Sequence, residues 1–309
     1  MIDVNAEIGK LDWSREPQGL YEPIGYTLAA GGKRVRPQLV LLATKLFGGN
    51  EEDVLPAALA LEVFHNFTLL HDDVMDKAQV RRGRPTVHVK WNANTAILSG
   101  DQMMIEAYKL LSQVPENKLA TTLRLFNQMA TEICEGQQYD VDFESREDVT
   151  IPEYMEMIRL KTSVLLAAAL RIGAYIAGAT DEQQEQIYNY GIHLGLAFQI
   201  QDDMLDCYGD QATFGKAIGG DIAENKKTYL WLTAAQKGAI DELAMREESM
   251  TQRFERILAI YDRLGVKAAA QEAIRLQTNQ AINCLDALPQ NQYTDQLRAM
   301  AHKLEERTK

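Results

Sequence analysis

The sequence predicts an all-α protein built from long helices. Apolar residues recur every three or four positions along most of the chain, as in LPAALALEVFHNFTLLHDD and YNYGIHLGLAFQIQDD, which is the spacing of one face of a helix. Alternating apolar and polar runs bounded by hairpin turn signals are scarce. With 309 residues and 46% hydrophobic content, the chain can bury a large core.

Breaks rich in glycine, proline and polar residues divide the chain into roughly ten helices, several of them about 20 residues or longer. In chain order the breaks are AAGGKRVRP, FGGNEED, DKAQVRRGRP, LSQVPENK, EDVTIPEY, AGATDEQ and CYGDQATFGKAIGGD. None of them is a long low-complexity linker. We therefore expect a single domain over residues 1–309, formed by one bundle of mostly antiparallel helices.

The composition excludes several classes of protein. The net charge of −12 and the isoelectric point near 5.0 argue against a nucleic-acid binder. The N-terminus lacks a basic segment followed by an apolar run, and the most apolar stretch, residues 164–179, is interrupted by Arg171, so we expect neither a secretory signal nor stable membrane insertion. Three scattered cysteines without CxxC spacing fit a reducing compartment. We expect a cytoplasmic protein.

Two acidic motifs with the same spacing, HDDVMD and QDDMLD, each follow an apolar helical segment. Their aspartates stand at positions i, i+1 and i+4, so the carboxylates of one motif project together and repel one another unless a cation lies between them. A single such motif is more often a solvated acidic surface, but two copies after segments expected to be buried favour metal binding. The candidate ligands are Asp72, Asp73, Asp76, Asp202, Asp203 and Asp206.

The ligand type predicts the metal. Carboxylates without cysteine or an HxxxH pattern suit a hard cation, and the sequence has no EF-hand loop. Mg²⁺ binds one or two carboxylates, keeps several waters and completes its coordination with substrate phosphates. The aspartates therefore predict a polyphosphate ligand bridged by Mg²⁺.

Such a ligand also needs cationic protein groups, and three short clusters supply them: Lys33, Arg34 and Arg36; Arg81, Arg82 and Arg84; and Lys216, Lys226 and Lys227. Short basic runs are usually solvated, and GGKR lacks the glycine spacing of a P-loop. The first two clusters nevertheless flank the first acidic segment, and Gly32 lets backbone N–H groups approach an anion. His65 lies two helical turns before Asp72 on the same face. Two diphosphates, one held with metal and one without, would use both kinds of charge.

In these residues the chain resembles the trans-isoprenyl diphosphate synthases, or polyprenyl synthetases. The motifs GGKRVRP, HDDVMDKAQVRRGRPTVH, GQQYD, KT, FQIQDDMLD, GK…GGD and NKKT occur in the family's order over nearly the whole chain. The resemblance implies an isoprenoid synthase fold with a deep central cavity, a homodimer, and two DDxxD motifs that face each other across the cavity. It also implies about three Mg²⁺ ions with the bound diphosphate, with Mn²⁺ as an alternative ion.

The resemblance further implies residue roles. Mg²⁺ on the allylic diphosphate would be held by Asp72, Asp73, Asp76, Asp202, Asp203 and Asp206. Contacts to that diphosphate or to the developing allylic cation would come from Arg81, Lys161, Thr162, Gln199, Lys216 and Lys226. Isopentenyl diphosphate, which has no metal of its own, would be bound by Gly32, Lys33, Arg36, His65 and Arg82. The last motif departs from the family, because Asn225 stands where many relatives have glycine.

The implied reaction is elongation of a prenyl chain. Metal and cationic groups stabilise the departing diphosphate, so that the allylic C–O bond ionises. The double bond of isopentenyl diphosphate attacks the carbocation, and the leaving diphosphate takes the proton that is lost. Because water must be excluded, the glycine-rich segment YGDQATFGKAIGG is expected to act as a lid.

Aromatic residues upstream of the first motif predict the product length. Phe67 and Phe64 lie five and eight residues before Asp72, or about 7.5 and 12 Å along a helix. Both are as consistent with ordinary core packing as with the floor of a pocket. An aromatic residue at the fifth position resembles short-chain synthases. Thr68, with no two-residue insertion inside DDxxD, resembles geranylgeranyl more than bacterial farnesyl synthases, so we expect an all-trans C15 to C20 product.

Two alternatives remain open. A class I terpene cyclase is also helical and magnesium-dependent, but it pairs one DDxxD with a different metal motif and needs no site for a second diphosphate. A non-catalytic regulatory subunit of a prenyl synthase is expected to lose at least one acidic motif, whereas this chain has both. The sequence does not determine whether the allylic primer is dimethylallyl, geranyl or farnesyl diphosphate.

Overall fold

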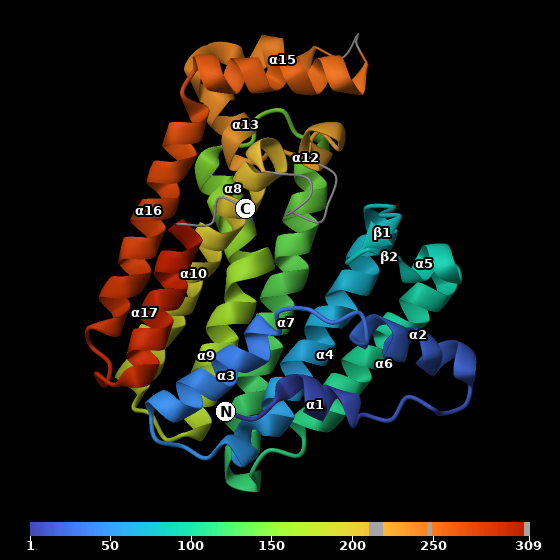
Figure 1. The fold of residues 1–309 in the computed structure, drawn as a ribbon, viewed down its shortest axis with the longest axis vertical. Coiled ribbons are helices and arrows are strands. Elements are labelled where there is room, and N and C mark those ends of the chain that lie inside the picture. Colours follow the sequence, from blue (N-terminus) through green and yellow to red (C-terminus); the bar gives the residue numbers. More distant parts are fainter. Residues whose placement is uncertain (210–218, 246–248, 306–309) are drawn as a thin grey trace. The chain divides into compact units, whose positions relative to one another are not determined.

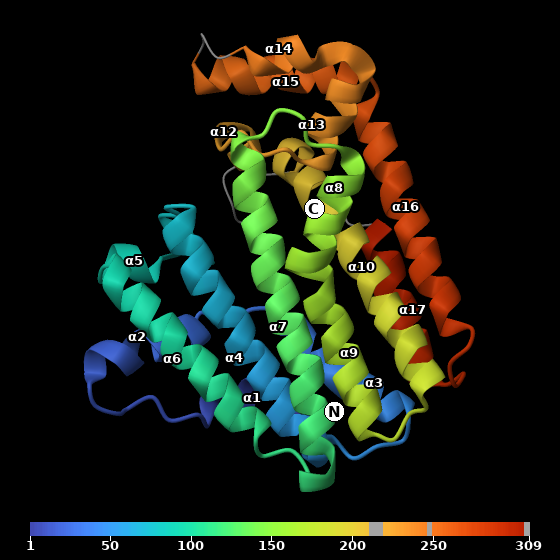
Figure 2. The ribbon, with the colours of Figure 1, turned by 180° about the vertical axis from the view of Figure 1, so that it is seen from behind.

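Figures 1 and 2 show a computed structural model of the chain, which describes residues 1–209, 219–245 and 249–305. These residues form α-helices, two short π-helical segments and a single antiparallel hairpin of two strands. The prediction of an all-α fold is confirmed. Helices α4, α7 and α10 reach 25, 30 and 28 residues, in agreement with the long helices predicted.

In chain order the elements are α1 (Val4–Gly9), α2 (Gln18–Leu28), α3 (Val35–Leu46), α4 (Glu51–Met75), β1 (Val80–Arg81), β2 (Arg84–Pro85), α5 (Val87–Lys90), α6 (Ala93–Leu111), α7 (Glu116–Ser145), α8 (Ile151–Ile158), the π segment η1 (Arg159–Ser163), α9 (Val164–Ile176), α10 (Asp181–Tyr208), α12 (Gly220–Ala223), α13 (Tyr229–Ala234), the π segment η2 (Ala235–Ala239), α14 (Ile240–Ala244), α15 (Met250–Arg263), α16 (Val266–Leu285) and α17 (Gln292–Glu305).

The chain divides into two compact units, whose boundaries fall within α7, α9 and α10. The first unit comprises Met1–Asn127 and Ala168–Glu185, and the second comprises Gln128–Ala167 and Gln186–Lys309. The expectation of a single domain stays a prediction.

In the first unit, α4 is the central helix and packs against both α3 and α6 (Figures 1 and 2). It begins after Asn50, whose side chain accepts a hydrogen bond from the Glu52 N–H, and acidic residues fill its first turn, where they complement the helix dipole. α4 is long and apolar enough to cross a membrane, but 67% of its most apolar window is buried inside the protein. It therefore behaves as a core helix.

In the second unit, α10 packs beside α16 and α17 (Figures 1 and 2). The buried Tyr190 hydroxyl of α10 donates a hydrogen bond of 2.8 Å to the Leu297 carbonyl of α17, which satisfies a polar group that would otherwise be costly to bury. The carboxyl end of α10 carries the second acidic motif, so this packing holds the motif on a rigid element.

The π segment η1 joins α8 to α9 and lies between two glycines. A Cβ added to Gly136 of α7 would lie 2.4 Å from the Lys161 backbone nitrogen, and one added to Gly195 of α10 would lie 2.5 Å from the Ser163 Cα. The absence of side chains at both positions lets the three backbones approach closely. Single π turns inside α-helices are frequent at functional sites, and η1 contains the predicted site residues Lys161 and Thr162.

Candidate active site

The first acidic motif lies at the carboxyl end of α4. Asp72 and Asp73 belong to the last turn of the helix, and Asp76 is its C-cap, with its N–H bonded to the Asp72 carbonyl. Asp73 is buried, and its Oδ1 accepts a hydrogen bond of 2.8 Å from Arg81 Nε. Burial raises the pKa of Asp73, while the Arg81 guanidinium acts in the opposite direction. Asp72 and Asp76 are half-buried.

The second basic cluster forms a tight hairpin directly after this helix. Val80 pairs with Pro85 and Arg81 pairs with Arg84, which leaves Arg82 and Gly83 as the two central residues. Both have positive φ, 52° and 72°, as a type I′ hairpin turn requires. The turn gives the two successive arginines different partners: Arg81 meets Asp73, and Arg82 Nη1 donates to the Gly31 carbonyl.

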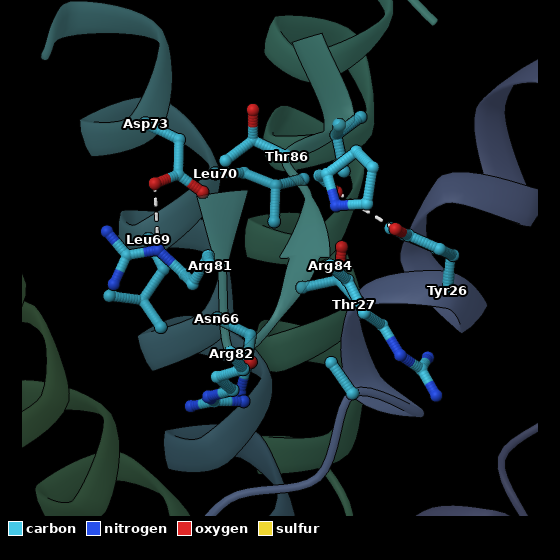
Figure 3. Close-up of a pocket in the computed structure, with 13 residues that line it drawn as sticks. Tyr26, Thr27, Asn66, Leu69, Leu70, Asp73, Arg81, Arg82, Arg84 and Thr86 are labelled. Carbon is cyan, nitrogen blue, oxygen red and sulfur yellow. Dashed lines mark hydrogen bonds and ion pairs between the residues drawn. The ribbon is translucent and has the colours of Figure 1, made fainter. Parts of the chain in front are cut away.

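A pocket opens beside this hairpin and is shown in Figure 3. It has about 360 Å³ of empty volume, open solvent included, and its lining combines α2, the end of α4 and the hairpin. Asp73 and Arg81 form an ion pair on its wall, and the Tyr26 hydroxyl donates to the Pro85 carbonyl across a distance of 2.9 Å. The structure thus places an acidic and a cationic group at one opening.

The first and second basic clusters meet in the first unit. Gly32 has a φ of 135°, and a Cβ at this position would lie 3.1 Å from the Arg82 guanidinium carbon, so glycine permits the close approach. Lys33 is exposed beside it. Burial lowers the pKa of Arg36 to about 10 and that of His65 well below 6.5, and neighbouring arginines lower the His65 pKa further. The cluster carries excess positive charge, which an anion would neutralise.

The second acidic motif lies at the carboxyl end of α10, and its aspartates differ in their surroundings. Asp203 is buried, and it accepts hydrogen bonds from the Tyr154 hydroxyl, from Gln199 Nε2 at 3.0 Å and from the Tyr229 N–H at 3.4 Å. Burial raises the pKa of Asp203 to about 7. Asp206 accepts bonds of 3.2 and 3.1 Å from the first two N–H groups of α12. Asp202 is half-buried.

Further predicted residues meet around η1. Lys161 Nζ lies 2.6 Å from Asp140 Oδ2, and the Thr162 hydroxyl donates to Gln199 Oε1 at 2.9 Å. Asp140 and Tyr154 were not predicted as site residues, although Asp140 is the last residue of the GQQYD motif. Neither an acidic nor an aromatic residue at these positions stands out in the sequence as a site residue. Their contacts to Lys161 and Asp203 reveal them.

The last basic cluster is described in part. Lys226 Nζ forms an ion pair of 2.8 Å with Glu224, and Lys227 is buried. Asn225 has a positive φ of 60°, which explains why glycine suits this position and why asparagine, which tolerates the left-handed region, can replace it. Lys216 lies outside the described residues, as does most of the segment predicted to be a lid.

The donor set fits a hard divalent cation. In the described part of the chain, no three His, Cys, Asp or Glu side chains gather into a complete metal site. Buried aspartates of both motifs, Asp73 in the first and Asp203 and Asp206 in the second, accept hydrogen bonds from protein donors. Such a set suits Mg²⁺, which takes one or two carboxylates and obtains its other ligands from water and phosphate. The motif of α4 belongs to the first unit and that of α10 to the second, and the carboxylates of each are of the type that Mg²⁺ binds.

The predicted chain-length residues lie in an aromatic cluster upstream of the first motif. The ring of Phe64 packs edge-on against Phe67 and Phe126, with centroids 5.3 and 5.2 Å apart, and Phe67 packs on His71 at 4.8 Å. Phe64 is fully buried, whereas Phe67 is half-buried. The Thr68 hydroxyl donates to the His65 carbonyl at 2.8 Å.

Comparison with known proteins agrees with the fold and the motifs. The family model for polyprenyl synthetase matches residues 17–263. The chain is 46% identical over 238 residues to a geranylgeranyl diphosphate synthase of Methanosarcina mazei, covering 76% of this chain and 73% of the relative. It is 39% identical over 324 residues to a geranylfarnesyl diphosphate synthase of Natronomonas pharaonis, covering 99% and 95%.

A solved structure of a geranylgeranyl pyrophosphate synthase superimposes with a TM-score of 0.93 at 44% identity, covering all of both chains. The prediction of the family and of its isoprenoid synthase fold is confirmed. Enzymes of this family use a divalent metal and isoprenoid diphosphate substrates. The chain belongs to the polyprenyl synthetase family and is a chain-elongating prenyltransferase of the short-chain trans type.

Proposed function

We propose that the protein condenses isopentenyl diphosphate with an allylic diphosphate and releases an all-trans C15 to C20 prenyl diphosphate. One observation carries this proposal: a single tight turn supplies Arg81 to the acidic end of α4 and Arg82 to the cationic region around Arg36, which His65 adjoins. An acidic site beside a cationic site suits two diphosphates held in different ways. A terpene cyclase has no use for the second site.

The acidic motifs would bind the allylic diphosphate through Mg²⁺. When bound, about three Mg²⁺ ions would supply positive charge to the departing diphosphate, and Mn²⁺ would serve as an alternative. Asp72, Asp76 and Asp202 would be direct ligands. Asp73 and Asp203 are buried and already accept protein hydrogen bonds, so we assign them the task of orienting Arg81 and Gln199. Asp206 would hold the start of α12.

Lys161, Thr162 and Gln199 would stabilise the ionising allylic group. The ion pair with Asp140 fixes the Lys161 ammonium, and the Thr162 hydroxyl and Gln199 amide hold each other at 2.9 Å. Groups held in this way need little reorganisation when charge develops, which is the basis of electrostatic catalysis. Lys226 and Lys216 would add positive charge to the same diphosphate.

Isopentenyl diphosphate would bind to Gly32, Lys33, Arg36, His65 and Arg82 without metal. Burial, and to a smaller extent neighbouring arginines, lower the pKa values of Arg36 and His65. A bound diphosphate would favour the charged forms of both groups, which supports this assignment. Arginine suits the task, since its planar fork can contact two phosphate oxygens at once. The double bond of this substrate would then attack the allylic carbocation, and the departed diphosphate would accept the proton.

The aromatic cluster of Phe64 and Phe67 supports a short product. Phe67 is half-buried on the turn of α4 that precedes the acidic motif, so its ring is placed to limit a growing chain, with Thr68 beside it. The relatives in the comparison include both geranylgeranyl and geranylfarnesyl synthases. We propose that the aromatic floor limits the prenyl product to the C15 to C20 range.

We propose that the protein is a cytoplasmic homodimer. Four large apolar side chains of α6, Ile97, Leu98, Ile105 and Tyr108, are 37–59% exposed and fall within one face of the helix at 100° per residue. A contiguous apolar face is typical of a surface that a second copy covers. The cysteines Cys134, Cys207 and Cys284 are free, as expected in a reducing compartment. Sedimentation of the protein and of Leu98→Arg would test the dimer.

The proposed reaction is tested by incubating purified protein with isopentenyl diphosphate and dimethylallyl, geranyl or farnesyl diphosphate, with Mg²⁺ or with EDTA. Elongated product only in the presence of metal is the expected result. A cyclic hydrocarbon formed from one allylic diphosphate alone would instead indicate a terpene cyclase. No product with any primer would favour a non-catalytic subunit.

A further inference from the structure

A buried ion pair lies beneath the cationic cluster of the first unit. Arg34 Nη1 and Glu62 Oε1 are 2.6 Å apart, and their side chains are 3% and 2% exposed. Arg34 also donates from Nη2 to the Leu28 carbonyl at 2.6 Å and from Nε to Asn5 Oδ1 at 3.1 Å. Every nitrogen of the guanidinium therefore has a partner that belongs to the protein.

This pair is adjacent to the proposed binding residues on both of its sides. Arg34 is the N-cap of α3, in the left-handed conformation with φ 47°, and it stands two residues before Arg36. Glu62 stands three residues before His65 on α4, so the two share a helix face. A non-glycine residue held at positive φ by a buried contact is the kind of local strain that functional sites retain.

Only half of the Glu62 carboxylate is occupied. Its Oε1 accepts from Arg34 and from Asn66 Nδ2 at 3.1 Å, whereas its Oε2 is buried and has no hydrogen-bond partner among the described residues. The Glu62 charge favours the charged forms of both Arg36 and Arg82, against the effect of burial on their pKa values. The Glu62 charge therefore acts on both of these arginines as well as on Arg34.

We propose that Arg34 is a positioning residue that occupies Glu62, so that Arg36 and Arg82 stay available to a diphosphate bound without metal. Without Arg34, the carboxylate would be an unpaired buried charge, which is strongly unfavourable. It would then pair with Arg36 or Arg82, and the diphosphate would have to compete with it. This inference rests on the proposed function, in which those two arginines hold isopentenyl diphosphate.

The experiment compares Arg34→Met with the double variant Arg34→Met/Glu62→Gln. Calorimetric titration with isopentenyl diphosphate, without Mg²⁺ and without an allylic substrate, measures binding in the absence of turnover. We expect Arg34→Met to weaken binding by about tenfold or more. The double variant, which has lost the competing carboxylate, should bind within about threefold of wild type. In turnover assays, the KM for isopentenyl diphosphate should rise and the KM for the allylic substrate should not.

A matched control is available in the same unit. Arg15 pairs with the buried Glu106 at 3.2 Å, and Lys109 pairs with the same carboxylate at 2.9 Å, so Arg15→Gln removes the arginine of a partly buried pair whose carboxylate keeps a second cation. It should leave the binding of isopentenyl diphosphate unchanged. Arg34→Lys keeps the positive charge and loses the planar guanidinium group. This variant should bind isopentenyl diphosphate within about threefold of wild type.

Binding equal to wild type in folded Arg34→Met would overturn the inference, as would a double variant that binds as weakly as Arg34→Met. If Arg34→Met does not fold, the double variant and Arg34→Lys still test the inference. A tenfold or greater loss of affinity for isopentenyl diphosphate in either variant would contradict a role of Arg34 in charge pairing with Glu62. The proposed function fails separately if wild type binds isopentenyl diphosphate and elongates no primer. Wild type that binds neither this ligand nor inorganic diphosphate would overturn both.

Discussion

The close approach of α7 to the π segment η1 makes Gly136→Ala an informative perturbation. The added Cβ would lie 2.4 Å from the Lys161 nitrogen and 2.8 Å from the Leu160 carbonyl carbon. Both are backbone atoms, and an ordinary contact begins at 3.4 Å, so η1 must move by about 1 Å to accept the methyl group. Gly19→Ala in α2 is the matched control, because a Cβ there has nothing within 4 Å.

The two substitutions are chemically identical but should have opposite effects. Alanine in a helix interior is favoured over glycine by about 1 kcal/mol. Gly19 lies in the first turn of α2, so Gly19→Ala should gain at most that amount. At Gly136 the crowding costs about 1–3 kcal/mol, which offsets the gain in helix propensity from alanine. The unfolding free energy of Gly19→Ala should therefore exceed that of Gly136→Ala by about 1–3 kcal/mol. Because η1 carries Lys161 and Thr162, a shift of about 1 Å should also lower kcat by up to about 10²-fold.

Urea unfolding and steady-state turnover with saturating substrates measure these two effects. The Gly19→Ala variant should retain wild-type kcat, since α2 gains no contact. If Gly136→Ala were as stable and as active as Gly19→Ala, the close packing of α7 on η1 would not position the catalytic groups, and the reasoning would be refuted.

Three further predictions concern the buried polar groups and the aromatic floor. Burial lowers the pKa of His65 in the folded protein, so below about pH 6.5 the unfolded chain binds a proton at His65 that the folded protein does not. The contribution of neutral His65 to the unfolding free energy is therefore present above about pH 6.5 and is lost as the pH falls, by at most ~1.4 kcal/mol per pH unit. Urea titrations at pH 5 and 8 should show that His65→Gln removes this part of the pH dependence of the unfolding free energy. Tyr154→Phe deletes a hydrogen bond to Asp203 and should lower the unfolding free energy by ~1.5–3 kcal/mol, with a control variant Tyr293→Phe unaffected. Phe67→Ala should lengthen the product by one or more C5 units, detected by chromatography of the dephosphorylated prenols, and unchanged length in both Phe67→Ala and Phe64→Ala would contradict the aromatic floor.

The helical architecture could be predicted because local signals determine it. The GGKR segment separates α2 from α3, and Gly48, Pro115 and Gly178 of other predicted breaks lie between consecutive helices. Pro152 instead lies in the first turn of α8, where a helix accepts proline. The aspartates of both motifs lie on helices at the expected spacing. These features depend on periodicity and turn chemistry, which a sequence displays directly.

Features that depend on tertiary contacts were not predicted. The strands beside Arg82 and Gly83 have two residues each, too few for an alternating pattern to be visible. The π segment depends on the approach of Gly136 from a distant helix. Glu62 follows an apolar run in the sequence, and nothing local indicates that its partner is Arg34, 28 residues earlier.

The type I′ turn at Arg82 and Gly83 has a consequence for how the chain tolerates insertions and deletions. Exposed loops usually accept a change of length, but this hairpin has the fewest central residues that its turn type allows. Adding or removing one residue would exchange the partners of the two arginines, so that neither Asp73 nor the Gly31 carbonyl would meet its present donor. Length at this turn should therefore be as constrained as side-chain identity, and a scan of single-residue deletions should find activity lost here while fold is kept.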